Sequence, residues 1–463
     1  MYSIRADHPL LRYGEAIFRH QPFRLLKGMA GAYVAYPIAE SREQRSVRPK
    51  VAELGRYYAQ PFRQRRKIAL ERLTSILQFA GEHVPYYRDL FRATHFDPLK
   101  AGQDPRYLEE LPFLTKDIIR EQGARLFSRP LDEGRHHACK TGGSTGLSCT
   151  IFYDQDAADY SSAVTLYARR RIGKHGYRSE LHFACRFPGE VVPQWPSRED
   201  FKCFAMNRSN IFFDRIDDAG LEEMWRTLKH RQPYLAHGHP STMYALACYI
   251  ERQYGSGKAF EVFESSGELL EAHQREVIER ALGCRVIDRY GLAELGVMAY
   301  ELDGHEHGFQ ILDSEGWPEQ RVDAQNVDGA AELVLTGFRN RLMPLIRYTT
   351  GDRARVEERE DGLFLTDVVG RIHDVVPING VIHPTHHIQD MLDHRVGGIQ
   401  EFQIDMRSAP PTLRIVLEPW ANENDTTNKL HHYWGDAFAI EYVGHEALTR
   451  VGRRAKFRHV VTA

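Results

Sequence analysis

The segment from residue 261 to residue 288 limits the possible folds more than any other part of the sequence. It reads as a strand over Glu261–Ser265, a helix over Leu270–Leu282 that Gly283 is placed to end, and a returning strand over Cys284–Asp288. A crossover of this kind joins two parallel strands and leaves their carboxyl ends, where ligands usually bind, at one edge of a sheet. The sequence therefore predicts an α/β fold.

Residues 1–125 are predicted to form the helical start of a large domain. One buried helix face is indicated by apolar residues at the 3, 4, 3 spacing, which are Leu70, Leu73, Leu77 and Ala80. Gly81 and Pro85 are expected to end that helix, and His83–Arg88 to form a turn. Leu111–Asp117 is expected to be a loop in which Thr115 caps the next helix.

Residues 126–370 are predicted to continue the large domain as an α/β core. Further strands are expected over Ala331–Thr336 and Gly362–Thr366. After residue 371 the pattern changes, and residues 376–463 are predicted to be a small α+β domain. Its strands are expected near Phe402–Met406 and Leu413–Leu417, with a polar insert over Ala421–Asn428.

Composition excludes several classes of protein. The 463 residues carry 61 Lys and Arg against 63 Asp and Glu, a net charge of -2, so no general polyanion-binding field is expected. No apolar run approaches the ~20 residues that span a bilayer, and the start of the chain lacks the apolar core of a secretory signal. Six scattered cysteines without a CxxC fit reduced thiols, and the adjacent histidine pairs complete no metal-ligand set. We expect a soluble, cytoplasmic protein.

The first motif that could bind a ligand is the stretch Lys140-Thr-Gly-Gly-Ser-Thr-Gly-Leu-Ser148, which precedes a strand-like segment. Three glycines among hydroxyl residues let consecutive backbone amides turn inward, as the binding of a polyphosphate requires. It is not a Walker A sequence. A plain glycine turn is the alternative interpretation.

The second motif consists of two polar loops, Ser265–Leu270 and Arg289–Glu294, each expected at the end of one strand of the parallel pair. Tyr290 could stack on a base and Glu294 could hold a magnesium ion. The alternatives are a helix N-terminal charge for Glu294 and a capping box joining Ser265 to Glu268.

The third motif is Pro344-Leu-Ile-Arg-Tyr-Thr-Thr-Gly-Asp352. An aspartate that closes a strand and turn can accept hydrogen bonds from two ribose hydroxyls, and otherwise forms an Asx turn. Two later motifs are Val369–Gly380 and the basic run Gly452–Arg458.

The order and spacing of these pieces resemble the adenylate-forming enzymes, in particular the branch of phenylacetate-CoA ligases and CapK-like capsular biosynthesis proteins. The likeness runs from about His83 to the C-terminus. It includes the stretches His83-Val-Pro-Tyr-Tyr-Arg, Leu111-Pro-Phe-Leu-Thr-Lys, His239-Pro-Ser, Ser265-Ser-Gly-Glu and Met343-Pro-Leu-Ile-Arg-Tyr. The resemblance implies a large N-terminal domain with mostly parallel sheets and a small α+β C-terminal cap that moves about a hinge at residues 371–375.

The resemblance also implies roles for individual residues. The phosphate loop would be Thr141, Gly142, Gly143, Ser144, Thr145 and Gly146, with Thr145 also catalytic. The adenine-side turn would be Ser266, Gly267 and Glu268, and the aromatic and magnesium-binding segment would be Arg289, Tyr290, Gly291 and Glu294. Asp352 would bind the ribose with Arg371 beside it, His373 or Asp374 would be the hinge residue, and Lys456 would bridge carboxylate and α-phosphate.

Three positions depart from the family pattern. Leu147 stands where a phosphate-loop lysine is usual, His373 is neither the usual Asp nor the usual Lys of the hinge, and Ala455 replaces the glycine before the C-terminal lysine. For the acyl pocket the sequence offers Phe183–Trp195 and Ala236–Pro240, within which His237 and Gly238 are the candidate substrate contacts.

The expected reaction uses MgATP to convert a small carboxylic acid to an acyl-adenylate, which is then passed to CoA. An amine acceptor and a catalytically inactive nucleotide-binding relative are the alternatives. Neither the charge nor aromatic interleaving around Arg450–His459 supports nucleic-acid binding. No nucleic-acid or membrane partner is expected, and the protein would be a monomer or a homodimer.

Overall fold

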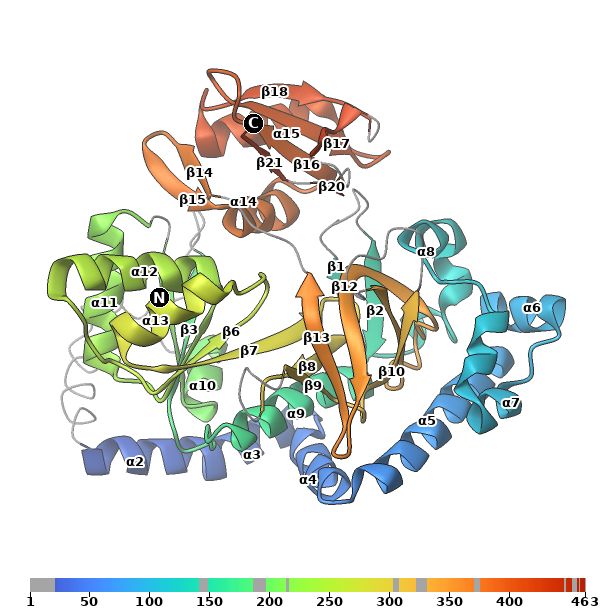
Figure 1. The fold of residues 1–463 in the computed structure, drawn as a ribbon. Coiled ribbons are helices and arrows are strands. Elements are labelled where there is room, and N and C mark those ends of the chain that lie inside the picture. The colour runs from blue at the N-terminus through green and yellow to red at the C-terminus, as the bar shows by residue number, and fades with distance from the viewer. Residues whose placement is uncertain are drawn as a thin grey trace. The chain divides into compact units, whose positions relative to one another are not determined.

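The structure, a computed structural model, describes residues 21–462 except 141–148, 186–196, 214–215, 303–307, 322–330, 370–374, 445–446, 452–455 and 458. The chain divides into two compact units (Figure 1). Unit 1 comprises Met1–Glu43, Gly173–Asp288 and Arg371–Ala463, and unit 2 comprises Gln44–Ile172 and Arg289–Gly370. Strand β7 (Arg285–Leu292) begins in unit 1 and ends in unit 2.

The middle segment of unit 1 is a parallel α/β layer. Its strands are β3 (Glu180–Cys185), β4 (Arg208–Phe213), β5 (Leu235–Gly238), β6 (Val262–Ser265) and the start of β7, in the order β7-β6-β5-β3-β4, with all neighbours parallel. Its helices are α10 (Arg198–Ala205), α11 (Asp218–Arg231), α12 (Pro240–Tyr254) and α13 (Ala272–Leu282). One apolar core joins α11, α12 and α13 to the sheet.

The predicted strand-helix-strand unit is confirmed as β6, α13 and β7. Gly283 ends α13 in the left-handed conformation at a φ of 57°, where a residue without a Cβ is favoured. Strand β7 is longer than predicted, because Arg289–Leu292 continues it and pairs antiparallel with β8. The expectation of a loop at Arg289 was therefore wrong, and the turn begins only at Ala293.

The first segment of unit 1 is helical from Gln21 to Arg42. It consists of α2 (Gln21–Ala30), the π-helical turn η1 (Gly31–Ala35) and α3 (Tyr36–Arg42).

The last segment of unit 1 is the predicted small α+β block with a core of its own. Its elements are β14 (Val375–Ile378), β15 (Val381–Pro384), α14 (Thr385–Met391), η6 (Leu392–Val396), β16 (Ile399–Asp405), β17 (Thr412–Leu417), α15 (Glu423–Trp434), β18 (Ala439–Tyr442), β19 (Arg450–Val451), β20 (Lys456–Phe457) and β21 (Val460–Val461). The strands near residues 402 and 413 are confirmed. Most of the predicted polar insert is instead the start of α15, which Asn422 caps.

Unit 2 is rich in helices, and those between residues 69 and 126 pack into one core with later strands. The helices of this unit are α4 (Val47–Tyr58), α5 (Phe62–His83), α6 (Pro85–Thr94), α7 (Pro98–Gln103), η2 (Pro105–Glu110), α8 (Lys116–Gln122), η3 (Gly123–Leu126), η4 (Leu131–Glu133) and α9 (Gln155–Arg171). The helix predicted from the leucine spacing is α5, and Leu73, Leu77 and Ala80 are buried in it. The Thr115 cap is confirmed, because its side chain accepts the backbone N–H of Ile118.

The turn predicted over His83–Arg88 was wrong. Pro85 ends α5 but also begins α6, because its fixed φ suits the first turn of a helix and it needs no hydrogen-bond partner there.

The strands of unit 2 form a hairpin and an antiparallel sheet. The hairpin is β1 (His136–Lys140) with β2 (Thr150–Asp154). The sheet holds β8 (Gly296–Tyr300), β9 (Phe309–Ile311), β10 (Gly316–Arg321), β11 (Ala331–Gly337), β12 (Tyr348–Glu358) and β13 (Leu363–Val369), in the order β10-β11-β12-β13-β9-β8-β7. The α/β class is confirmed. The expectation of mostly parallel sheets was too simple, because the parallel strands β3 to β7 continue into an antiparallel half of the same sheet in unit 2. Within the described residues no helix is both long and apolar enough to cross a bilayer.

Candidate active site

Tyr290 and Asp352 meet inside unit 2. Tyr290 lies on β7 and Asp352 on β12, and the Tyr290 hydroxyl donates a 2.9 Å hydrogen bond to Asp352 Oδ2. Burial and then the Asp352 charge hold the pKa of Tyr290 well above its usual value of 10, so the hydroxyl remains a donor. Asp352 lies within a strand and does not form the Asx turn offered as an alternative.

Glu294 lies in the turn between β7 and β8, and its side chain is 6% exposed. Its Oε1 accepts a 2.7 Å hydrogen bond from the Tyr348 hydroxyl and lies 3.5 Å from Lys116 Nζ. The alternative of a helix N-terminal charge is therefore wrong, because no helix begins at this turn. A buried carboxylate with these partners has a fixed position.

Lys116 and Tyr348 are site residues that the sequence analysis missed. Both lie in stretches that carried the resemblance, but there they were noted only as parts of a motif. An isolated parallel β-bridge joins the two stretches in the folded chain. Leu114 N donates to Arg347 O at 2.9 Å, and Thr349 N donates to Leu114 O at 3.1 Å. The loop before α8 is thus held against the start of β12.

Tyr87 plays a similar part for the residues before β12. Its buried hydroxyl donates to Pro344 O at 2.9 Å and accepts from Ile346 N at 3.2 Å. The Tyr87 side chain therefore fixes the backbone that leads to Tyr348 and Asp352.

The predicted phosphate loop, Thr141–Gly146, lies outside the described residues, but the strands on either side of it are described. Lys140 pairs with Thr150 in the β1–β2 hairpin, so the loop connects two antiparallel strands. Tyr153 of β2 donates a 2.6 Å hydrogen bond to the carbonyl oxygen of Ala293, directly before Glu294. The hairpin that carries the glycine loop is therefore joined to the Glu294 turn.

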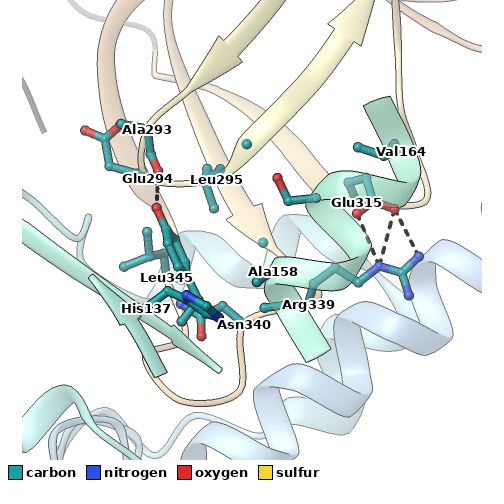
Figure 2. A pocket seen from close by; sticks show the side chains of 15 residues that line it. His137, Ala158, Val164, Ala293, Glu294, Leu295, Glu315, Arg339, Asn340 and Leu345 are labelled. Atoms are coloured by element: carbon teal, nitrogen blue, oxygen red, sulfur yellow. Dashed lines mark hydrogen bonds and ion pairs between the residues drawn. The ribbon is translucent and has the colours of Figure 1, made fainter. Parts of the chain in front are cut away.

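A cavity of about 210 Å³ lies between these elements of unit 2. Figure 2 shows the Ala293–Glu294 turn on one side of it and the ion pair of Arg339 and Glu315 on the other. Arg339 Nη2 lies 3.0 Å from Glu315 Oε1, and the pKa of Arg339 is raised chiefly by this carboxylate against the opposing effect of burial. The cavity thus contains no uncompensated charge at this end.

The adenine-side turn and the His237 strand lie together in unit 1. Ser266 N donates to Gly238 O at 3.2 Å, and Ser241 N donates to Glu268 Oε2 at 3.1 Å. Gly267 has a φ of 87°, and a Cβ there would meet the His239 ring. Ser265 is the last residue of β6, so the capping box with Glu268 offered as an alternative was wrong.

His237 is held by a fully buried carboxylate. Its Nδ1 lies 2.9 Å from Glu264 Oε2, and its ring packs against His182 at 4.8 Å between centroids. His182 in turn lies 3.1 Å from Glu180, which pairs with Lys174 at 3.0 Å. The stretch Ala236–Pro240, offered for the acyl pocket, comprises the end of β5, His239 and the first residue of α12.

Several predicted residues lie outside the described part of the chain, including Arg371, His373, Asp374, Phe187 and Trp195. Lys456 lies on β20, which pairs with β19. Their roles stay predictions.

A magnesium site at Glu294 is compatible with its chemistry, because Mg²⁺ is commonly held by one or two carboxylates together with substrate phosphates. Among the described residues no group of three or more His, Cys, Asp or Glu side chains could hold a metal by itself. A magnesium ion held at Glu294 would therefore need the substrate phosphates as further ligands.

Comparison with known proteins supports an adenylate-forming class. The chain is 28% identical to a phenylacetate-coenzyme A ligase of Pseudomonas putida over 347 residues, which is 71% of this chain and 75% of the relative. It is 25% identical to Protein CapK of Staphylococcus aureus, covering 66% of this chain and 67% of the relative. No family model matches.

Among solved structures, a 2-hydroxyisobutyryl-CoA ligase in complex with 2-HIB-AMP and CoA matches with a TM-score of 0.54 at 20% identity, covering 88% of this chain and 91% of that one. The fold is that of the adenylate-forming enzymes. The sequence likeness is to phenylacetate-CoA ligases and to Protein CapK, as the resemblance predicted.

Proposed function

We propose that the chain is an ATP-dependent acid–CoA ligase that activates a small carboxylic acid as its acyl-adenylate. The observation that carries the proposal is the convergence in unit 2 of Tyr290 with Asp352, of Glu294 with Lys116 and Tyr348, and of the hairpin that carries the glycine loop. The phenylacetate-CoA ligase relatives support the same activity.

In the first step a carboxylate oxygen of the acid attacks the α-phosphorus of MgATP. The bond from that phosphorus to the bridging oxygen breaks, and pyrophosphate leaves with the negative charge. The amides and hydroxyls of Thr141–Gly146 and the Lys456 ammonium would stabilise this charge electrostatically. Asp352, oriented by Tyr290, would bind the ribose hydroxyls, and Ser266–Glu268 would border the adenine.

Glu294 would bind the magnesium ion of MgATP, which neutralises phosphate charge when bound. The neighbouring groups fix where this carboxylate lies. Tyr348 holds Oε1 and Lys116 lowers the cost of burying the charge. Arg289 and Gly291 flank Tyr290 on β7 and would complete the nucleotide contacts of this strand.

In the second step the CoA thiolate attacks the acyl carbonyl, the thioester forms, and AMP leaves. A swing of residues 376–463 about His373 or Asp374, with Arg371 beside the hinge, would remove Lys456 and admit the acceptor. His237 and Gly238 would border the acyl group, with His237 held in one orientation by Glu264.

The test is acid-dependent exchange of labelled pyrophosphate into ATP, with a panel that includes phenylacetate and 2-hydroxyisobutyrate. We expect exchange with at least one acid, and formation of its CoA thioester when CoA is added. Exchange without a thioester, but with amide formation from a supplied amine, would identify the alternative acceptor. ATP binding without any exchange across the panel would contradict the proposed activity.

A further inference from the structure

The first described segment of the chain exposes an unusual amount of apolar surface. Eleven large hydrophobic side chains are exposed among the described residues, and seven of them lie between residues 23 and 38. We call these seven the apolar helix face; its members are Phe23, Leu25, Leu26, Met29, Tyr33, Val34 and Ile38. Figure 1 shows α2 and α3, which carry the face with η1 between them.

The opposite face of this segment determines which side points outward. Gly28, Gly31 and Ala35 are buried. A Cβ on Gly28 would clash with the carbonyl oxygen of Tyr177, and one on Gly31 with that of Phe204. The segment therefore packs its glycines closely against the backbone of residues 173–288 in the same unit. If the helix rotated about its axis to bury the large side chains, they would clash with these carbonyl groups.

The amphipathic pattern is thus reversed relative to an ordinary surface helix, which buries its large apolar residues. Arg24 anchors the arrangement by donating hydrogen bonds to Gln232 Oε1 and to the carbonyl oxygen of His230, both at 3.1 Å. Helix α10 packs against η1 and α3, and it adds the exposed Phe201.

The size and chemistry of the apolar helix face fit another copy of this chain. Side chains of this kind at these exposures present on the order of 700 Å², near the ~800 Å² that each partner buries in a standard protein interface and above most patches on monomers. Phenylalanine, tyrosine and methionine are enriched in such interfaces.

A lipid surface fits the face less well. Helices that lie in a membrane interface carry a strongly charged face rich in Lys and Arg. From Gln21 to Ala39 the only cations are Arg24 and Lys27, and the side opposite the apolar residues is occupied by contacts to unit 1. The segment has no charged face to meet anionic headgroups.

We propose that the apolar helix face is the self-complementary contact of a twofold homodimer. In such an interface each face meets the same face of the other copy, so a charge introduced once appears twice in one contact. The proposal is independent of the enzymatic activity, because none of these side chains belongs to the candidate active site.

The test is sedimentation velocity of the full chain over a range of concentrations. The variant carries Leu26→Asp with Tyr33→Asp, and the matched control carries Leu99→Asp with Trp420→Asp. The controls replace exposed apolar residues outside the face, and Leu99, at 55% exposed, is comparable to Leu26 at 59%. We expect the wild type and the control to dimerise, and the dissociation constant of the face variant to rise at least about 10-fold.

Circular dichroism of the wild type, the face variant and the control separates loss of the dimer from loss of the fold. If the face variant unfolds, the single change Val34→Asp takes its place. A wild type that stays monomeric at the highest concentration measured overturns the proposal, as does a folded face variant that dimerises as the wild type does. A monomeric wild type that binds phosphatidylglycerol vesicles also overturns it and assigns the face to a membrane surface.

Discussion

Tyr290 donates a hydrogen bond to the carboxylate of Asp352 across 62 positions of sequence. The bond holds one carboxylate oxygen of the residue that is proposed to bind the ribose. The hydroxyl is buried with its acceptor, so water cannot replace it readily when it is removed.

Replacing Tyr290 with Phe should weaken nucleotide binding without unfolding the protein. A hydrogen bond to a charged group is worth ~1.5–3 kcal/mol, which corresponds to roughly 10- to 150-fold, so we expect KM for ATP to rise at least about 10-fold, with a smaller change in kcat. The matched control is Tyr249→Phe, which removes a 3.0 Å hydrogen bond to Glu222 elsewhere and should leave KM unchanged. An unchanged KM for Tyr290→Phe would exclude this role.

The effect of Tyr290→Phe should not depend on pH between about 6 and 9. Burial and the Asp352 charge raise the pKa of Tyr290 well above 10. At every pH below that pKa the hydroxyl is protonated in the folded state and can donate its hydrogen bond. The ratio of KM values for variant and wild type should therefore be constant over this range. A ratio that falls towards one at alkaline pH would show that Tyr290 ionises there.

Lys116→Met should destabilise unit 2. It removes the cation beside the buried Glu294 carboxylate, and breaking one side of a buried pair costs about 3 kcal/mol. We expect Tm to fall by several degrees, and the double change with Glu294→Gln to recover part of the loss. Lys258→Met, which removes an exposed pair with Glu261, should change Tm little. Equal effects of the two lysine changes would contradict the buried pairing.

Lys456→Ala should lower acid-dependent pyrophosphate exchange about 10² to 10³-fold while leaving ATP binding intact. Lys429→Ala, in the same C-terminal block and paired with Asp425, is the control and should retain full exchange. An exchange rate equal to wild type would remove Lys456 from the mechanism.

Asp405 should contribute stability that is lost in acid. Hydrogen bonds from Arg407, with further attraction from Arg414, hold its pKa below the ordinary value, so its stabilising effect is present above about pH 4 and declines as pH falls through its folded-state pKa. Asp405→Asn should therefore lower Tm at pH 7 and flatten its fall below pH 4. The control Asp436→Asn alters an exposed carboxylate and should change neither Tm at pH 7 nor its fall below pH 4. If the Tm of wild type and of Asp405→Asn fell in parallel below pH 4, Asp405 would not be the source of this acid sensitivity.

The sequence predicted local structure best where one pattern decided it. Apolar spacing placed α5, and the hydroxyl of Thr115 placed the start of α8, because helix faces and caps depend on nearby residues. Pro85 was misread because proline both ends one helix and suits the first turn of the next. The length of β7 was missed because its last residues are fixed by pairing with β8, which local sequence does not encode.

The same distinction holds for the site. The resemblance singled out Tyr290, Glu294 and Asp352 as candidate site residues, and all three lie in unit 2. It did not identify Lys116 and Tyr348 as the partners of Glu294, since those contacts join segments separated by more than 50 residues and exist only in the folded chain.

The central claim, attack of a carboxylate on the α-phosphorus, is tested most directly by an oxygen-18 transfer. The accepted acid is supplied with an ¹⁸O-labelled carboxylate, together with ATP and CoA, and AMP is analysed by mass spectrometry. The proposed chemistry predicts one ¹⁸O atom in the AMP phosphate, because the acyl C–O bond breaks when the thioester forms. Label found in inorganic phosphate, with unlabelled AMP or ADP as the nucleotide product, would contradict it.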